Sequence, residues 1–191
     1  MPNLYMIGGA NGSGKTTVSR QLLPNVFNCL EYVNADTIAA GISAFNPEAV
    51  AIQAGRLMLE RLQILSKSGV DFAFETTLAA RTFAPFLRSC KNQGYTINLM
   101  YFWLPTPELA IERVRQRVAS GGHSIPEAVI RRRYERGRHN LISLYIPLCD
   151  TWIIYDNSHA VSWLVAEGVR ERSPIIYQPE IWQQITNLSY E

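Results

Sequence analysis

The sequence carries, close to its N-terminus, the stretch Gly9-Ala10-Asn11-Gly12-Ser13-Gly14-Lys15-Thr16-Thr17. It contains the pattern G-x-x-x-x-G-K-[ST], and it follows a short apolar run, residues 4–7, and precedes an amphipathic stretch. Glycines let consecutive backbone N–H groups turn toward one point, and the N-terminus of a following helix adds partial positive charge. The stretch therefore predicts a site for the phosphates of a nucleotide.

Within this stretch, Lys15 is expected to reach the β- and γ-phosphates of ATP, and the hydroxyl of Thr16 to hold Mg²⁺. The backbone from Gly9 to Thr17 is expected to bind the rest of the triphosphate. The alternative is a glycine-rich turn between a strand and a helix with an incidental lysine. The chain has no N-K-x-D motif for reading guanine, which argues against a GTPase.

The composition is that of one ordinary globular domain. The chain has 191 residues, of which 47% are hydrophobic and 18% charged, and its formal net charge is +2. The longest strongly apolar run, residues 99–104, is far shorter than the roughly 20 residues of a membrane span. No secretory signal is recognisable, so we expect a cytoplasmic protein that forms a single domain over residues 1–191. The widely spaced Cys29, Cys90 and Cys149 predict reduced thiols in the core.

Short β-rich runs alternate with amphipathic stretches from one end of the chain to the other, which indicates an α/β fold. The runs are nearly continuous in apolar residues, as is typical of parallel strands covered on both faces. They lie at residues 4–7, 32–34, 71–74, 95–104 and 152–155. We predict a P-loop NTPase fold: a parallel five-stranded sheet with helices on both faces. After Asn157 we expect a further strand near residues 161–165, a loop that holds Pro174, and a closing helix from Pro179.

Asp36 follows the second predicted strand in the sequence Asn34-Ala35-Asp36. The carboxyl ends of parallel strands open on one edge of the sheet, which is where the phosphate site lies. A carboxylate there can accept a proton from an attacking hydroxyl, and it can help to hold Mg²⁺. We therefore expect Asp36 to be catalytic and a metal ligand, and Asn34 to contact the substrate. The alternative is that Asp36 is the N-cap of the next helix.

The third predicted strand ends in Glu75-Thr76-Thr77, which brings a carboxylate and two hydroxyls to the same edge. Such groups can bind an acceptor substrate or order the water shell of a metal ion. We expect Glu75 and Thr77 to contact the substrate. The alternative for all three is capping of the helix that begins near Ala80.

Arginine is concentrated in one segment. The chain has 15 Arg and 3 Lys, and eight of the arginines lie between Arg113 and Arg138. Two amphipathic helices with a glycine-rich loop between them account for this segment, which we expect to form a lid at about residues 113–140. Guanidinium groups on a mobile lid can neutralise the charge of a transferring phosphoryl group while excluding water. Their positions beside the apolar stripes make Arg117 and Arg133 the expected catalytic arginines.

Two alternatives remain open for this segment: a solvated basic face, and a patch that binds nucleic acid. A nucleotide-binding nucleic-acid module or a polynucleotide kinase would use the arginine hairpin in the second way. We consider a nucleic-acid partner less consistent with the chain than a small-molecule acceptor, and we expect no membrane partner.

Taken with the phosphate stretch, three further motifs make the chain resemble the zeta toxin family of small P-loop kinases. These are Asn34-Ala-Asp36, Phe74-Glu75-Thr76-Thr77, and Arg117-Val-Ala-Ser-Gly-Gly-His-Ser-Ile-Pro-Glu127 with Arg132-Arg133-Tyr134. Tyr155-Asp-Asn-Ser158 fits as well, and the resemblance runs from about residue 4 to residue 168.

This resemblance implies transfer of the γ-phosphate of ATP to the sugar of UDP-N-acetylglucosamine, and control by an antitoxin. It implies Asp36 as general base, Lys15 and Thr16 as ligands of phosphate and Mg²⁺, and Arg117 and Arg133 as charge clamps. It also implies that Glu75 and Thr77 lie on the acceptor side. Our expectation is therefore a kinase that uses ATP and Mg²⁺ and phosphorylates a hydroxyl of a small metabolite.

Overall fold

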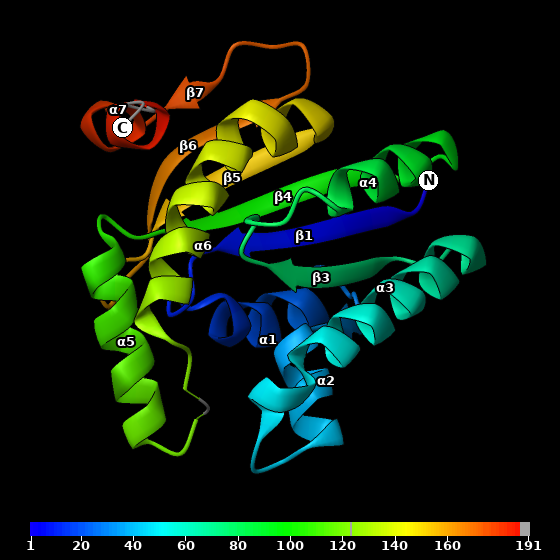
Figure 1. Cartoon of the computed structure of the whole chain (residues 1–191). Helices are drawn as coiled ribbons and strands as arrows, with labels where there is room; N and C mark the ends of the chain where they lie inside the picture. Colours follow the sequence, from blue (N-terminus) through cyan, green and yellow to red (C-terminus); the bar gives the residue numbers. More distant parts are fainter. Residues whose placement is uncertain (123, 188–191) are drawn as a thin grey trace.

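A seven-stranded sheet forms the centre of the computed structural model, which describes residues 1–122 and 124–187 (Figure 1). The strands lie in the order β2-β3-β1-β4-β5-β6-β7. The first five in sequence are parallel, whereas β6 and β7 are antiparallel additions at one edge. Their bounds are β1 Asn3–Gly9, β2 Glu31–Val33, β3 Phe72–Thr76, β4 Thr96–Trp103, β5 Thr151–Asp156, β6 Trp163–Val169 and β7 Ile175–Ile176.

Helices cover both faces of the sheet. One face carries the largest core cluster, in which α3, α4, α7 and the segment after α6 pack on residues such as Phe74 and Leu99. The other face packs Ile7, Met100 and Phe102 against α1. The bounds are α1 Lys15–Asn25, α2 Ala35–Ile42, α3 Ala51–Ser68, α4 Phe83–Asn92, α5 Pro107–Ala119, α6 Glu127–Asn140 and α7 Pro179–Thr186. Short 3-10 turns precede α3 (Pro47–Val50) and follow α6 (Ile146–Leu148), the latter after a π-helical turn, Leu141–Tyr145.

The sheet register brings the functional segments together. β1 lies between β3 and β4, with Ile7 opposite Glu75 and Gly9 opposite Phe102. The loops after β1, β2 and β3 therefore leave the sheet at one edge, and α5 and α6 stand beside that edge (Figure 1).

The prediction of five strands was wrong, because the sheet has seven. The expected strand near residues 161–165 exists as the longer β6, and the loop expected around Pro174 leads into β7. β7 has only two residues, both exposed, so it carries no alternating or continuous apolar pattern that a sequence could reveal. The closing helix from Pro179 is confirmed as α7.

All three cysteines are buried and free, as predicted. Across the described ranges, 1–122 and 124–187, the helices are all too short or too polar to cross a membrane.

Candidate active site

The phosphate stretch forms the turn between β1 and α1. Gly9 has φ 145° and Gly14, which precedes α1, has φ 85°, a conformation that residues with a Cβ rarely adopt. A Cβ on Gly9 would lie 2.4 Å from the carbonyl oxygen of Phe102, so the close approach of β4 also demands glycine there. The side chain of Asn157, after β5, donates a hydrogen bond of 2.6 Å to the carbonyl of Ser13 and braces the turn from outside.

Lys15, the first residue of α1, is buried and curls back over the turn. Its ammonium donates to the carbonyl oxygen of Ala10 at 2.7 Å and lies 3.9 Å from a carboxylate oxygen of Glu75. Burial lowers the pKa of Lys15, although the carboxylates of Glu75 and Asp36 oppose that shift. A cation without full solvation is a strong binding group for an incoming phosphate anion.

Thr16 faces the same carboxylate. Its hydroxyl donates to the two Glu75 oxygens at 2.9 and 3.1 Å, and the phenol of Tyr32 donates a hydrogen bond to Glu75 as well. Burial and the charge of Glu75 raise the pKa of Tyr32, so the phenol remains a donor. A hydroxyl and a carboxylate in contact are suitable oxygen ligands for Mg²⁺. In the described part of the chain no cluster of three or more His, Cys, Asp or Glu is placed to hold a metal ion.

Asp36 lies in the first turn of α2, close to this cluster. The N-cap of α2 is Asn34, whose side-chain oxygen accepts hydrogen bonds from the backbone N–H groups of Asp36 (2.8 Å) and Thr37 (3.2 Å). The capping role considered for Asp36 is therefore filled by Asn34. The amide nitrogen of Asn34 also donates to the phenol of Tyr32 at 3.2 Å, so one hydrogen-bonded chain joins Thr16, Glu75, Tyr32, Asn34 and the backbone of Asp36.

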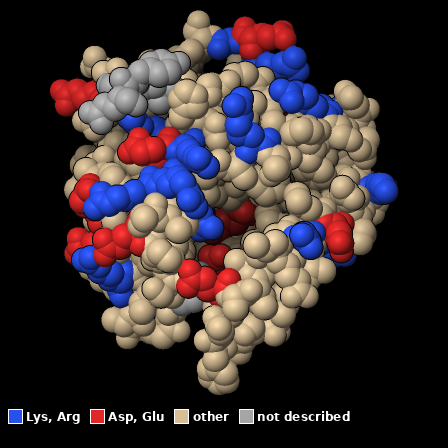
Figure 2. Space-filling model, in the orientation of Figure 1, with Lys and Arg blue, Asp and Glu red and all other residues tan. Residues whose placement is uncertain are grey.

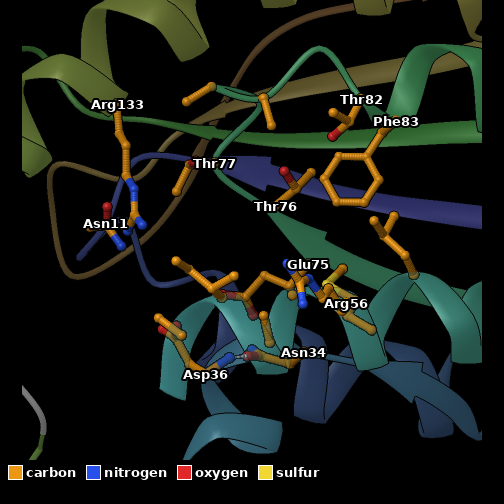
Figure 3. Close-up of a pocket in the computed structure, with 18 of the residues that line it drawn as sticks. Asn11, Asn34, Asp36, Arg56, Glu75, Thr76, Thr77, Thr82, Phe83 and Arg133 are labelled. Carbon is orange, nitrogen blue, oxygen red and sulfur yellow. Dashed lines mark hydrogen bonds between the residues drawn. The ribbon is translucent and has the colours of Figure 1, made fainter. Parts of the chain in front are cut away.

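A cavity of about 450 Å³ opens onto this chain of residues (Figure 3). It brings together most of the side chains expected to act on phosphate or acceptor: Lys15, Asn34, Asp36, Glu75, Thr77 and Arg133. Thr77 lines the wall opposite α2, whereas the hydroxyl of its neighbour Thr76 accepts a hydrogen bond from the backbone N–H of Leu78 at 3.1 Å. The hydroxyl of Thr76 therefore stabilises the loop between β3 and α4.

Of the two arginines expected to clamp phosphate, Arg133 lines the cavity, whereas Arg117 is not among its lining residues. Arg117 on α5 and Arg133 on α6 each lower the pKa of the Lys15 ammonium through charge repulsion. Arg133 lines the main cavity and also a smaller one of about 280 Å³ between α6 and α2, which Asp36 shares. On the face shown in Figure 2, acidic side chains lie within a central hollow, basic side chains lie to its upper left and right, and acidic side chains also lie below it.

Four other arginines of this segment are engaged within the protein. Arg115 pairs with Glu127 and Arg131 with Glu108, and both ion pairs tie α5 to α6. Arg113 donates to the carbonyls of Asn157 (2.7 Å) and Ser158 (2.8 Å). Arg138 donates to the carbonyl of Gln184 (2.9 Å) in α7. The high arginine content therefore serves largely to hold the helical hairpin in place.

Thr17, which we expected to bind the nucleotide, lies exposed in the first turn of α1. The sequence analysis missed Tyr32 and Asn157, and also Arg56, which lines the cavity. Tyr32 could have been predicted from the sequence, because it lies two residues before Asn34 and side chains two apart on a strand share a face. For Asn157, the contact crosses 144 positions of sequence and leaves no local signal.

Comparison with known proteins agrees with this geometry. The sequence model of the zeta toxin family matches residues 1–164. An uncharacterized protein of Haemophilus influenzae is 31% identical over 126 residues, which cover 66% of this chain and 88% of that protein.

Two solved structures resemble the whole chain. One is the complex AvrRxo1-ORF1:-ORF2 with ATP, with a TM-score of 0.80 and 17% identity over 100% of this chain. The present chain spans 65% of the matched chain in that complex. The other comes from the PezAT chromosomal toxin-antitoxin system of Streptococcus pneumoniae, with a TM-score of 0.67, 18% identity, and coverage of 100% of this chain and 80% of that one. At these identities the two structural likenesses establish a shared fold. The family model matches most of the sequence, so the protein belongs to the zeta toxin family of small P-loop kinases.

Proposed function

We propose that the protein transfers the γ-phosphate of ATP to a hydroxyl group of a small metabolite. The observation that carries this proposal is that Lys15, Asp36, Glu75 and Arg133 line the same cavity. A phosphate-binding turn alone would support nucleotide binding. A carboxylate that shares its cavity, with its helix capped by another residue, supports transfer to an acceptor.

ATP binds with its phosphates in the turn from Gly9 to Thr16. Lys15 exchanges its hydrogen bond with the Ala10 carbonyl for the β- and γ-phosphate oxygens. Thr16 and Glu75 are the side chains that would hold Mg²⁺, which when bound neutralises charge on the β- and γ-phosphates. This revises the expected metal ligands, since Glu75 rather than Asp36 is the carboxylate that Thr16 contacts.

The acceptor hydroxyl attacks the γ-phosphorus in line with the leaving oxygen of ADP. A bond forms between the acceptor oxygen and phosphorus, the bond from phosphorus to the β–γ bridging oxygen breaks, and the hydroxyl proton passes to the Asp36 carboxylate. Arg117 and Arg133 balance the negative charge on the equatorial oxygens of the transferring group. Thr77, on the opposite wall of the cavity, contacts the acceptor.

Within this class we propose a UDP-amino sugar as the acceptor, since the family match spans residues 1–164 and includes all the residues named above. We also propose that a partner protein regulates the enzyme, because one structural relative comes from a toxin-antitoxin system. A nucleic-acid acceptor is less well supported, since four arginines of the hairpin are engaged in contacts within the protein.

The test is phosphate transfer from ATP labelled at the γ-position to a panel of hydroxyl acceptors that includes UDP-N-acetylglucosamine. Asp36→Asn should lower the transfer rate by about 10²- to 10⁴-fold while ATP affinity stays within about twofold of the wild type. Lys15→Met should weaken both transfer and ATP binding. Full activity of Asp36→Asn would remove Asp36 from the mechanism, and failure of every acceptor would refute the proposed function.

A further inference from the structure

The cavity of the candidate active site extends beyond the reacting residues, along helix α3. On this side its wall consists of Ala51, Gly55, Met58 and Leu59, which lie on one face of α3 at helical spacing. Phe83 closes the opposite wall. Small side chains at positions 51 and 55 leave room for a ligand beside the helix, and a Cβ on Gly55 would meet no atom within 4 Å. The extension is therefore open space of the kind an acceptor molecule would occupy.

Arg56 brings a positive charge to this extension. It lies on α3 and lines the cavity, and Figure 3 shows its side chain reaching from the helix toward the interior of the pocket. Across residues 1–122 and 124–187, its guanidinium makes neither a hydrogen bond nor an ion pair. It does not pair with Glu60, one turn further along the same helix, although that spacing commonly produces ion pairs. By contrast, Arg61 on the same helix is paired with Glu31 at 2.7 Å.

The other two cationic side chains that line the cavity, Lys15 and Arg133, are those that we propose bind the phosphates of ATP. Lys15 bonds to the turn that would hold the triphosphate, and Arg133 approaches from α6. Arg56 comes from a different element, and its neighbours in the cavity wall are the apolar side chains of Ile52 and Leu59. Arg56 is exposed to solvent and lines the cavity, so its planar guanidinium can reach a phosphate or carboxylate of a ligand bound there.

We infer that Arg56 binds an anionic group of the acceptor, so that the substrate is a hydroxyl compound carrying a phosphate or carboxylate, with its hydroxyl directed toward Asp36. This inference rests on the proposed function, because it assigns the extension to the acceptor of that reaction. It makes Arg56 a specificity-determining residue that contacts substrate and has no part in the transfer of phosphate itself.

The experiment compares neutral and anionic forms of the same compound. Isothermal titration is performed with protein saturated with Mg²⁺ and a non-hydrolysable ATP analogue, so that the phosphate turn is already filled. The probes are glucose with glucuronate and glucose 1-phosphate, uridine with uridine monophosphate, and N-acetylglucosamine with its 1-phosphate and with UDP-N-acetylglucosamine. The variants are Arg56→Ala, Arg56→Glu and the control Arg61→Ala, which removes a charge from the same helix outside the cavity.

On at least one scaffold the anionic form should bind the wild-type protein at least about tenfold more tightly than its neutral partner. Arg56→Ala should abolish that preference, Arg56→Glu should reverse it, and Arg61→Ala should retain it. Comparison of the carboxylate with the phosphates identifies which anion is recognised. The absence of any preference, or its persistence in Arg56→Ala, would overturn the inference.

Transfer assays on the same probes separate this inference from the proposed function. Equal phosphorylation of neutral and anionic acceptors would leave the kinase intact and remove the role of Arg56. Binding that depends on Arg56 without transfer to any probe would retain the anion site and count against the kinase. An effect of Arg56→Ala on the KM for ATP, with the KM for the acceptor unchanged, would assign Arg56 to the nucleotide and also overturn the inference.

Discussion

The hydroxyl of Thr16 and the carboxylate of Glu75 are in direct contact, with oxygen–oxygen distances of 2.9 and 3.1 Å. They are 59 positions apart, and the sheet brings them together, since Ile7 of β1 lies opposite Glu75 of β3. Glu75 also lies 3.9 Å from the ammonium of Lys15. One carboxylate thus faces both Lys15 and Thr16, the two side chains of the turn that we propose contact the triphosphate and its metal ion.

Replacing Glu75 should therefore affect the metal more than the nucleotide. Glu75→Gln keeps the shape of the side chain and removes its charge, so we expect the concentration of Mg²⁺ needed for half-maximal activity to rise by about 10- to 100-fold. Binding of ADP without Mg²⁺ should change little. Titration of activity with Mg²⁺, alongside calorimetry with ADP in the presence of a chelator, measures the two quantities. An unchanged Mg²⁺ requirement would return Glu75 to the acceptor side.

Tyr32 is the residue that fixes the orientation of this carboxylate. Its phenol donates to Glu75 and accepts from the side chain of Asn34, the cap of α2. Tyr32→Phe removes both contacts with little change of shape and leaves Glu75 with one donor fewer, which should cost about 1 kcal/mol of stability. We expect kcat to fall about tenfold with a parallel loss of Mg²⁺ affinity, while the KM for ATP stays constant. A variant that loses stability and keeps its Mg²⁺ dependence would indicate a purely structural tyrosine.

The lowered pKa of Lys15 predicts how nucleotide affinity depends on pH. In the free protein, burial lowers the pKa of the ammonium, whereas bound phosphate would raise it by favouring the charged form. Between these two pKa values binding takes up a proton, so the affinity for ADP should fall as pH rises through the pKa of the free protein. The buried thiols do not interfere, because burial raises the pKa of Cys29 and Cys90 to about 11 and that of Cys149 to about 12.

Calorimetry of ADP binding between about pH 7 and 10, in buffers of different ionisation enthalpy, detects this proton uptake directly. Lys15→Met should bind ADP weakly and without the pH dependence. Equal proton uptake in wild type and Lys15→Met would assign the titration to another group.

The sequence predicted the parallel centre of the fold well, because buried parallel strands are almost continuous in apolar residues and the glycine turn fixes the first strand and helix. The sequence also predicted Asp36, Glu75 and Arg133 as site residues. Asp36 and Glu75 follow apolar strands and Arg133 flanks an apolar helical stripe, and polar residues at such positions have few structural roles. These side chains line one cavity. Their assignment to individual ligands depends on contacts between strands, which the order of residues does not reveal.

What escaped prediction depends on distant parts of the chain. β7 is two residues long and is defined by its pairing with Ala166 and Glu167 of β6. The sequence also did not reveal which arginines make structural contacts and which line the cavity, because the partners of Arg113 and Arg138 lie more than forty residues away. Arg56 belongs to no motif, and only the folded chain brings it to the cavity.

The arginine hairpin offers matched variants. Arg117→Ala and Arg133→Ala should each lower the transfer rate by about a thousandfold if the guanidinium groups stabilise the transferring phosphoryl group. Arg115→Ala and Arg131→Ala break exposed ion pairs between α5 and α6, and because such pairs contribute little to stability, transfer should remain within a few-fold of the wild type. Single-turnover rates and urea unfolding measure the two effects separately. Equal losses in all four variants would indicate that the hairpin acts through its overall charge.

Gly137 predicts an unusual response to alanine. Glycine within a helix is normally less favourable than alanine by about 1 kcal/mol, so Gly55→Ala in α3, where a Cβ meets no atom within 4 Å, should raise the free energy of unfolding. A Cβ on Gly137 would instead lie 2.3 Å from the carbonyl oxygen of Thr77, in the loop between β3 and α4. Asn140, one turn further along α6, holds this same loop through the carbonyl of Leu78 at 2.8 Å.

Gly137→Ala must therefore push α6 away from the loop that carries Thr77, and overpacking of this kind costs about 1–3 kcal/mol. Because the same displacement moves Arg133 on α6 relative to Lys15, the transfer rate should fall further than the loss of stability alone would cause. Urea unfolding and single-turnover transfer at a temperature where the variant is fully folded distinguish the two. If Gly137→Ala stabilises the protein as Gly55→Ala does, then α6 is free to move away from the loop without cost, and the contact with Thr77 does not position the lid.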